Sequence, residues 1–183
     1  MSLSGNFEGN TVLIYTPEGE ELRQTVISAH DKTLQQIEVR NGVPQSLDIG
    51  DVCPILIMTQ PTPIEFQARV AKSGTERVFV LFKGKTKEDR QHTRYKVNFP
   101  ARLDSFISDG QTFPLHKPLE IRVIDISRSG IRFAAPTNSL MKGDKFSIVL
   151  NFDGGEKTFV GTVKNLRDRN GVLAEYGCKL MHK

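Results

Sequence analysis

Apolar residues along this chain recur in short segments in which buried-type and polar positions alternate. A spacing of two is typical of a β-strand with one buried face, whereas an amphipathic helix needs a spacing of about 3.6. The pattern predicts strands almost throughout and shows no convincing helical period. In the first half the predicted strands are Thr11–Tyr15, Gln24–Ser28, Leu34–Arg40, Asp51–Thr59, Ile64–Lys72 and Arg77–Phe82. In the second half they are Tyr95–Leu103, Leu119–Ile126, Gly130–Ala134, Lys145–Phe152, Thr158–Leu166 and Leu173–Met181.

Turn-forming residues separate the predicted strands. Thr16–Gly19 and Ser73–Gly74 each lie between two of them, and Asn41–Gly42 is a hairpin signal. We expect Ser105–Lys117, which contains glycine, proline and histidine, to be a loop, and Arg169–Gly171 to be a turn. No internal repeat is visible. Short strands at this spacing favour a small barrel or sandwich.

One polar segment, residues 83–94 (KGKTKEDRQHTR), interrupts the strand pattern and has no apolar residue at a core spacing. Such a segment is typical of a linker between domains. A length of 183 residues is sufficient for two domains that each bury a core. The predicted organisation is therefore all-β with two small domains, each a barrel or a sandwich: residues 1–84 and residues 90–183, joined by a basic linker over 85–94.

The charge differs between the two halves of the chain. Residues 1–82 carry 6 Lys and Arg against 10 Asp and Glu, a net charge of −4, while residues 83–183 carry 19 against 11, a net charge of +8. A positive field favours an anionic partner, most simply one that carries phosphate. The competing interpretation is a solvated basic surface that keeps the domain soluble.

Several classes of function lack their sequence signals. The two cysteines, Cys53 and Cys178, are far apart, which supports neither a disulfide framework nor a zinc site. The four histidines lack metal-ligand spacing, and the chain has no P-loop, no GxGxxG and no nucleophile elbow. We expect no enzyme activity and no metal. The first residues do not resemble a signal peptide and no apolar run is long enough for a membrane span, so we expect a cytoplasmic protein.

The first candidate motif is RxxxR, Arg90 to Arg94, placed just before the predicted strand that begins at Tyr95. In an extended or loop segment, two guanidinium groups this close can converge on one anion. Each offers a planar set of donors to phosphate oxygens and a flat face on which a base can stack. Taken alone the motif is common, and an exposed linker is the simpler explanation.

The second candidate motif is DxSxxG, Asp125 to Gly130, at the end of a predicted strand. Asp125 can accept hydrogen bonds from the ring N–H and amino group of a guanine edge, and Ser127 can donate and accept beside it. Gly130 permits a left-handed backbone or a close approach that a Cβ atom would block. Taken alone, a β-turn capped by Asp and Ser and closed by Gly is the simpler explanation.

Together the two motifs resemble the PilZ domain family, in which RxxxR in a linker precedes a strand and DxSxxG follows at a later strand end. Two further segments look like that family, Gly130–Ala134 (GIRFA) and Tyr176–Leu180 (YGCKL). The resemblance covers roughly Asp89 to the end of the chain. The preceding β-domain is similar, in layout, to the split-barrel-like N-terminal domain of the two-domain flagellar-brake proteins of the same family.

The resemblance implies a six-stranded β-barrel that binds cyclic di-GMP, a second messenger of bacteria. By the family pattern, Arg90 and Arg94 hold phosphates and stack on guanine, while Asp125, Ser127 and Gly130 line a guanine edge. Neighbouring residues are weaker candidates for the same site: Asp89, Gln91, Arg128, Ser129 and Lys179.

The implied protein is a receptor whose ligand orders the linker and reorients the two domains. Its output is flagellar motility or another cyclic di-GMP response, through the flagellar motor or another effector, and it acts as a monomer or homodimer. Some family members carry a basic residue where this chain has Asp89, which leaves open whether one ligand or an intercalated pair binds.

A second function from another class is a β-barrel that binds single-stranded nucleic acid through the basic half. Such surfaces need aromatic platforms on which bases stack. The three tyrosines and eleven phenylalanines fall mostly at alternating strand positions, where a core role is expected, and they do not cluster near the linker. A third interpretation, an adaptor that has lost the pocket, is disfavoured because both motifs are intact.

Overall fold

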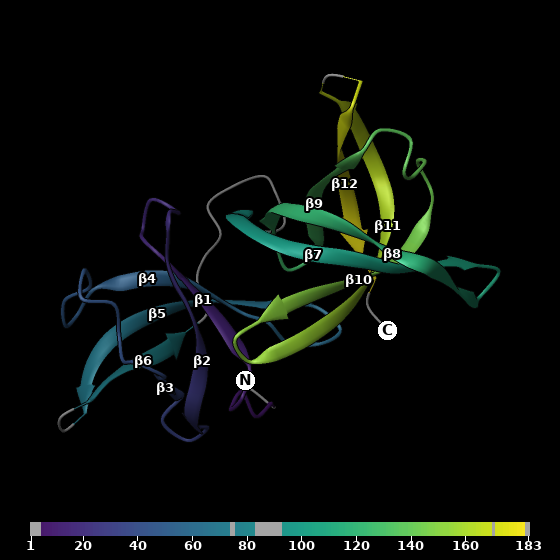
Figure 1. Cartoon of the computed structure of the whole chain (residues 1–183). Coiled ribbons are helices and arrows are strands. Elements are labelled where there is room, and N and C mark those ends of the chain that lie inside the picture. Colours follow the sequence, from purple (N-terminus) through teal and green to yellow (C-terminus); the bar gives the residue numbers. More distant parts are fainter. Residues whose placement is uncertain (1–4, 74–75, 83–92, 170, 182–183) are drawn as a thin grey trace. The chain divides into compact units, whose positions relative to one another are not determined.

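The computed structural model describes residues 5–73, 76–82, 93–169 and 171–181. Within these ranges the chain forms twelve strands and no helix, one strand for each that the sequence predicts (Figure 1). The first six are β1 (Thr11–Tyr15), β2 (Glu21–Asp31), β3 (Gln36–Val39), β4 (Val52–Ile57), β5 (Ile64–Ser73) and β6 (Glu76–Phe82). The others are β7 (Tyr95–Ser108), β8 (Gln111–Ile126), β9 (Gly130–Pro136), β10 (Lys145–Phe152), β11 (Gly155–Asp168) and β12 (Leu173–Leu180). The prediction of an all-β chain is confirmed.

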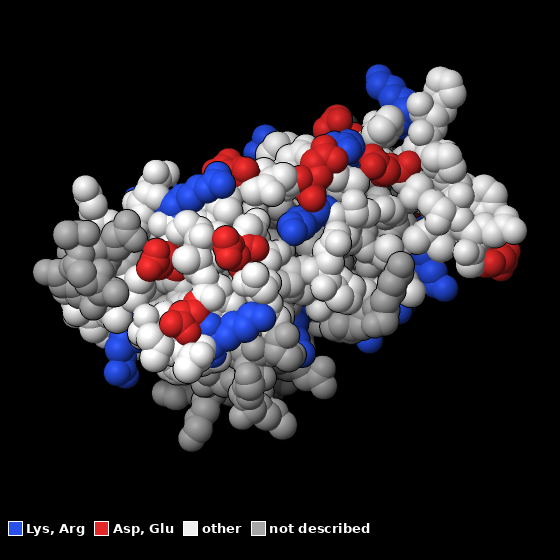
Figure 2. Space-filling view, turned by 90° about the horizontal axis from the view of Figure 1, so that it is seen from below, with Lys and Arg blue, Asp and Glu red and all other residues white. Residues whose placement is uncertain are grey.

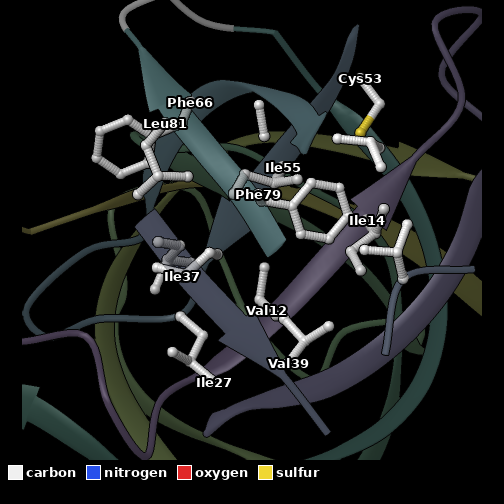
Figure 3. Close-up of a cluster of buried hydrophobic side chains, with 14 of the residues drawn as sticks. Val12, Ile14, Ile27, Ile37, Val39, Cys53, Ile55, Phe66, Phe79 and Leu81 are labelled. Atoms are coloured by element: carbon white, nitrogen blue, oxygen red, sulfur yellow. The ribbon is translucent and has the colours of Figure 1, made fainter. Parts of the chain in front are cut away.

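The first six strands close into a barrel in the order β1-β2-β3-β6-β5-β4, and every neighbouring pair is antiparallel. Closure occurs between β4 and β1, where Ile57 lies opposite Val12. A closed barrel has no open sheet edge. Side chains from several strands, including Ile14, Ile37 and Phe79, meet in its interior (Figure 3).

The last six strands close into a second barrel in the order β10-β11-β12-β9-β8-β7, also with antiparallel neighbours. Strand β7 shows why the sequence predicts it: its burial alternates from Tyr95 to Leu103, with every second side chain buried. The interior holds a group of aromatic rings. Phe133 meets Phe146 edge-on at 5.6 Å between ring centroids and stacks on Tyr176 at 5.5 Å.

The chain divides into two units, residues 1–59 with 63–91, and residues 60–62 with 92–183, and each unit contains one barrel. The two barrels follow the same path: the first strand of each neighbours the second and the fourth, and the third neighbours the sixth. The expectation of two small β-barrels is therefore confirmed. Most of the predicted linker, 85–94, lies outside the described residues.

Besides sharing a strand path, the two barrels share a short sequence repeat before their fourth strands. The expectation of no internal repeat is wrong there. Ser46–Asp51 (SLDIGD) and Ser139–Asp144 (SLMKGD) precede the fourth strand of their barrels, and both match S-L-x-x-G-D. Gly50 and Gly143 adopt almost the same left-handed backbone, with φ of 98° and 99°. The backbone contacts also match: Gly50 N–H to Val70 O and Val70 N–H to Asp51 O in one barrel, Gly143 N–H to Val163 O and Val163 N–H to Asp144 O in the other.

The repeat extends into the following hairpin, where the two barrels fill the same space differently. Cys53 of β4 lies opposite Ala68 of β5, and Phe146 of β10 lies opposite Gly161 of β11. A Cβ atom added at Gly161 would lie 2.8 Å from Cζ of Phe146, which is too close for two carbon atoms. The second barrel thus combines a large ring with a missing side chain, where the first combines two small side chains.

The expected loop at Ser105–Lys117 is wrong. These residues extend β7 and β8 into a hairpin that continues beyond the part of the sheet where β8 pairs with β9 (Figure 1). Its turn is Asp109–Gly110, with φ of 49° and 76°, as a two-residue hairpin turn requires. The strand residues of β8 here are mostly exposed on both faces, so they show no alternation of apolar and polar positions. Without that alternation, these strand residues could not be recognised from the sequence.

The hairpin expected at Asn41–Gly42 is also wrong. Both residues have a left-handed backbone, as such a turn needs, with φ of 61° and 67°. However, the strands on either side, β3 and β4, are not neighbours in the barrel. The two carbonyl oxygens of this turn instead accept hydrogen bonds from NH1 of Arg23, at 3.0 and 2.8 Å.

The first barrel also contains a histidine in an apolar setting. The ring of His30 stacks on Phe7 at 4.7 Å, and Phe7 is part of the core. Nδ1 of His30 accepts a hydrogen bond from the backbone N–H of Phe7 at 3.2 Å, which requires a neutral imidazole. Burial lowers the pKa of His30, the charge of Lys32 lowers it further, and Asp31 opposes both.

We predict that Gly161→Ala destabilises the protein by about 1–3 kcal/mol, because the new methyl group overlaps the Phe146 ring in a close-packed core. Urea denaturation measures the free energy of unfolding. Removing the ring edge with Phe146→Leu should reduce the added cost of Gly161→Ala, because the two changes share one space.

Gly177→Ala on β12 is the matched control, since a Cβ atom there makes only ordinary contacts of 3.6 Å or more. Its effect should stay within about 0.5 kcal/mol. Equal losses of stability in Gly161→Ala and Gly177→Ala would contradict this account of packing in the second barrel.

We predict that the free energy of unfolding decreases as the pH falls below about 6.5, in part because of His30. The unfolded imidazole takes up a proton near its ordinary pKa, whereas the folded one, with its lowered pKa, resists protonation. Above that pH the imidazole is neutral in both the folded and the unfolded state, so His30 adds no pH dependence to the free energy of unfolding. Denaturant titrations between pH 8 and pH 5.5 should show a shallower decline for His30→Asn, while the exposed His116 serves as control in His116→Asn. If stability declined equally with pH in His30→Asn and His116→Asn, a group other than His30 would cause the pH dependence.

Candidate functional site

The described residues of the two motifs meet at one end of the β7–β8 pair. Tyr95, the first residue of β7, lies opposite Ile126, the last residue of β8. Arg94 immediately precedes Tyr95 and is exposed, and Ser127 immediately follows Ile126. The register therefore brings the second arginine of RxxxR to the same end of the second barrel as the DxSxxG turn.

The turn itself joins β8 to β9 and is closed by its own serine. Ser127 is buried, and its backbone N–H donates to the carbonyl oxygen of Gly130 at 2.8 Å. Its Oγ donates to the same carbonyl at 3.3 Å. Arg128 at the tip is exposed and Ser129 is half-buried. The backbone N–H of Leu180 donates to the Ser129 carbonyl at 2.9 Å, which ties the turn to β12.

Gly130 is required by a close approach of two strands and not by a left-handed backbone. It lies opposite Lys179 of β12, and a Cβ atom built on it would be 2.9 Å from the carbonyl oxygen of Cys178. The sequence left open a left-handed backbone or a close approach for this glycine, and the structure supports the close approach. The exposed side chain of Lys179 thereby lies next to the turn.

Asp125 is the charged residue of the motif, and it does not cap the turn. Its side chain is 8% exposed and forms an ion pair with Arg132, which lies directly opposite it on β9. Nε and NH2 of Arg132 approach Oδ2 of Asp125 at 2.6 and 2.5 Å. NH1 of Arg132 donates to Oε2 of Glu175 on β12 at 3.1 Å, and Arg169 contacts the other oxygen of Glu175.

The sequence did not predict Arg132, Glu175 or Arg169 as members of this group. Arg132 lies between two strongly apolar residues in GIRFA, so its alternation predicts only that it points away from the core. Its partner Glu175 is 43 residues away, and only the pairing of β9 with β12 connects them. A cross-strand partner at that separation has no signal in one sequence.

Three of the predicted site residues, Asp89, Arg90 and Gln91, lie outside the described residues. The structure therefore adds no position for the first arginine of RxxxR. The described candidates fall in three places, namely the start of β7, the β8–β9 turn and the facing part of β12: Arg94, Asp125, Ser127, Arg128, Ser129, Gly130 and Lys179.

Both cysteines are buried and unpaired, one in each barrel. Burial, and to a smaller extent the charge of Asp51, raises the pKa of Cys53 to about 11, and burial raises the pKa of Cys178 to about 12. Thiols with such pKa values stay protonated near neutral pH and are poor nucleophiles. They behave as small core residues, in agreement with a sequence that supports neither a disulfide framework nor a zinc site.

Charged side chains of both signs are interspersed on the molecular face drawn in Figure 2. In the part of the chain that the structure describes, no group of three or more His, Cys, Asp or Glu side chains is placed to hold a metal ion. Over the same residues no helix is long and apolar enough to cross a membrane.

Solved structures with some similarity to this chain include three proteins. The PilZ domain of YcgR from Escherichia coli with c-di-GMP is 17% identical, with a TM-score of 0.39 over 51% of this chain and 79% of that chain. The Bacillus subtilis inhibitor of motility MotI/DgrA is 12% identical, with a TM-score of 0.39 over 100% and 90%. The K. pneumonia MrkH–c-di-GMP complex is 16% identical, with a TM-score of 0.37 over 95% and 80%.

The comparison with protein-family models matches the second half of the chain. No curated protein matches the chain. The model of the PilZ domain matches residues 88–183, more than half of the chain, and these residues include RxxxR, DxSxxG and all six strands of the second barrel. The chain therefore belongs to the PilZ domain family.

Proposed function

We propose that this protein is a cyclic di-GMP receptor whose ligand binds the second barrel at the β8–β9 turn. The observation that carries the proposal is the register of β7 with β8, because it brings Arg94 to the end of β8 where Asp125 lies and the turn with Ser127 begins. A cyclic dinucleotide offers both phosphates for cations and guanine edges for a carboxylate. The family match over residues 88–183 supports the same ligand.

Each motif residue has a chemical role in this proposal. Arg90 and Arg94 bind phosphate oxygens and stack on guanine, because a guanidinium combines a donor fork with a flat face. Asp125 accepts from guanine N–H groups, and Ser127 hydrogen-bonds beside it. Gly130 keeps the turn close to β12. The neighbouring candidates line the periphery of the site: Asp89, Gln91, Arg128, Ser129 and Lys179.

The proposed receptor is cytoplasmic and not an enzyme, with an N-terminal barrel over 1–84, a linker over 85–94 and the PilZ domain over 90–183. Ligand binding orders the linker and changes the arrangement of the two barrels, which alters the surface shown to the flagellar motor or another effector. A monomer or a homodimer serves this mechanism equally well. One ligand or an intercalated pair satisfies the same residues.

Single-stranded nucleic acid is the alternative ligand, and the aromatic residues argue against it. All three tyrosines and most of the eleven phenylalanines are buried. A nucleic-acid platform needs aromatic faces exposed beside the basic groove. Two described phenylalanines are exposed: Phe82 ends β6 in the first barrel, and Phe113 lies on the hairpin extension of β8, at the other end of that strand from the turn.

We predict that Arg90→Ala or Arg94→Ala weakens cyclic di-GMP binding about tenfold or more, because each removes charge-assisted hydrogen bonds worth about 1.5–3 kcal/mol. Isothermal titration calorimetry of the full chain measures both the affinity and the number of ligands bound. Arg122→Ala is the matched control: this arginine is exposed on β8 and donates to Asn98.

Two results would contradict the proposal. Unchanged affinity in both motif variants would show that the ligand binds elsewhere. Oligonucleotide binding that declines steeply with salt, without saturable cyclic di-GMP binding, would favour the nucleic-acid alternative.

A further inference from the structure

A single guanidinium group connects two buried carboxylates of the second barrel. Arg132 on β9 contacts Oδ2 of Asp125 on β8 through both Nε and NH2, and Oε2 of Glu175 on β12 through NH1. Its donors therefore point in two directions, toward the strands on either side of β9. The planar fork of an arginine can fix the direction of a carboxylate in this way, whereas a lysine offers one point charge.

Burial makes this contact important for Asp125. The side chains of Asp125 and Glu175 are only 8% and 5% exposed, while that of Arg132 is 36% exposed. A buried carboxylate without a cation nearby is costly, so Arg132 compensates two charges at once. Arg169 contacts the second oxygen of Glu175, which completes a row of alternating charges on the outer side of the barrel wall.

The contact uses only one oxygen of Asp125. The two nitrogens of Arg132 that contact Asp125, Nε and NH2, both lie at Oδ2, and within the described part of the chain no hydrogen bond reaches Oδ1. A carboxylate held by one oxygen presents the other in a fixed direction. That remaining oxygen can accept from an N–H group of a base.

We infer that Arg132, oriented by Glu175, is a positioning residue for base recognition: it fixes the Asp125 carboxylate at Oδ2 so that Oδ1 accepts from guanine. The inference depends on the proposed function, because it assigns a ligand to Oδ1. Arg132 itself does not contact the base. Its effect on affinity arises from fixing the Asp125 carboxylate before the ligand arrives, which lowers the entropic cost of binding.

A purely structural role for Arg132 makes a different prediction, and a double-mutant cycle separates the two. The cycle uses calorimetric titration of cyclic di-GMP into the full-length wild type, Arg132→Gln, Asp125→Asn and the double variant. We expect Arg132→Gln to weaken binding about tenfold in the wild type and less than about twofold when Asp125 is already Asn. Arg122→Gln, the same change at an exposed arginine of β8, should leave the affinity unchanged.

Arg132→Lys keeps the cation and provides a second test if Arg132→Gln does not fold, as thermal unfolding would show. A lysine cannot contact both carboxylates at once. The affinity of Arg132→Lys for cyclic di-GMP should therefore lie between those of the wild type and Asp125→Asn. Wild-type affinity in a folded Arg132→Gln or Arg132→Lys variant would overturn the inference and leave the proposed function intact. Equal losses from Arg132→Gln with and without Asp125 would also overturn it, because Arg132 would then act independently. Absence of binding by the wild type would overturn both.

Discussion

The candidate site depends on how closely β9 approaches β12. At Gly130 the two backbones are so near that a Cβ atom would lie 2.9 Å from the carbonyl oxygen of Cys178. The approach fixes the register, and the register places Arg132 opposite Asp125 on one side and near Glu175 on the other. A shift of one residue would turn each of these side chains to the opposite face of the sheet, since side chains alternate along a strand. The glycine of the motif is thus a condition for the charged network, beyond any contact it makes with a ligand.

The two barrels share a strand path but use the hairpin between their second and third strands differently. In the first barrel, Oδ1 of Asp31 accepts hydrogen bonds from the backbone N–H groups of Thr33 and Leu34, at 2.8 and 3.0 Å. That carboxylate is occupied by its own turn. In the second barrel the corresponding turn is closed by Ser127, and Asp125 is left to interact across the sheet. The same framework therefore produces a self-contained turn in one barrel and a carboxylate that pairs across the sheet in the other.

The sequence predicted the strands because nearly all of them have one buried face, and it was wrong where that condition fails. The hairpin within Ser105–Lys117 is solvated on both faces, so no alternation indicated it. Asn41–Gly42 has the backbone of a hairpin turn, but pairing of the flanking strands is decided by the barrel as a whole. The local part of the site, Asp125 to Gly130, was recognisable because its residues are close in sequence. Arg132 and Glu175 were not, because their contact is created by strand pairing across 43 residues.

The proposed receptor function accounts for the charged network better than stability does. Burying two carboxylates beside a partly exposed guanidinium removes much of the hydration of the carboxylates. Well-packed apolar side chains of similar size commonly give equal or greater stability. The other buried parts of the second barrel follow that apolar solution, with Phe133, Phe146 and Tyr176 packed against one another. The network lies instead on the outer side of the wall, at the end of β8 where the turn and Arg94 meet. In the proposed receptor, a carboxylate fixed in direction at that position can accept from a hydrogen-bonding partner outside the barrel, which an apolar replacement would not do.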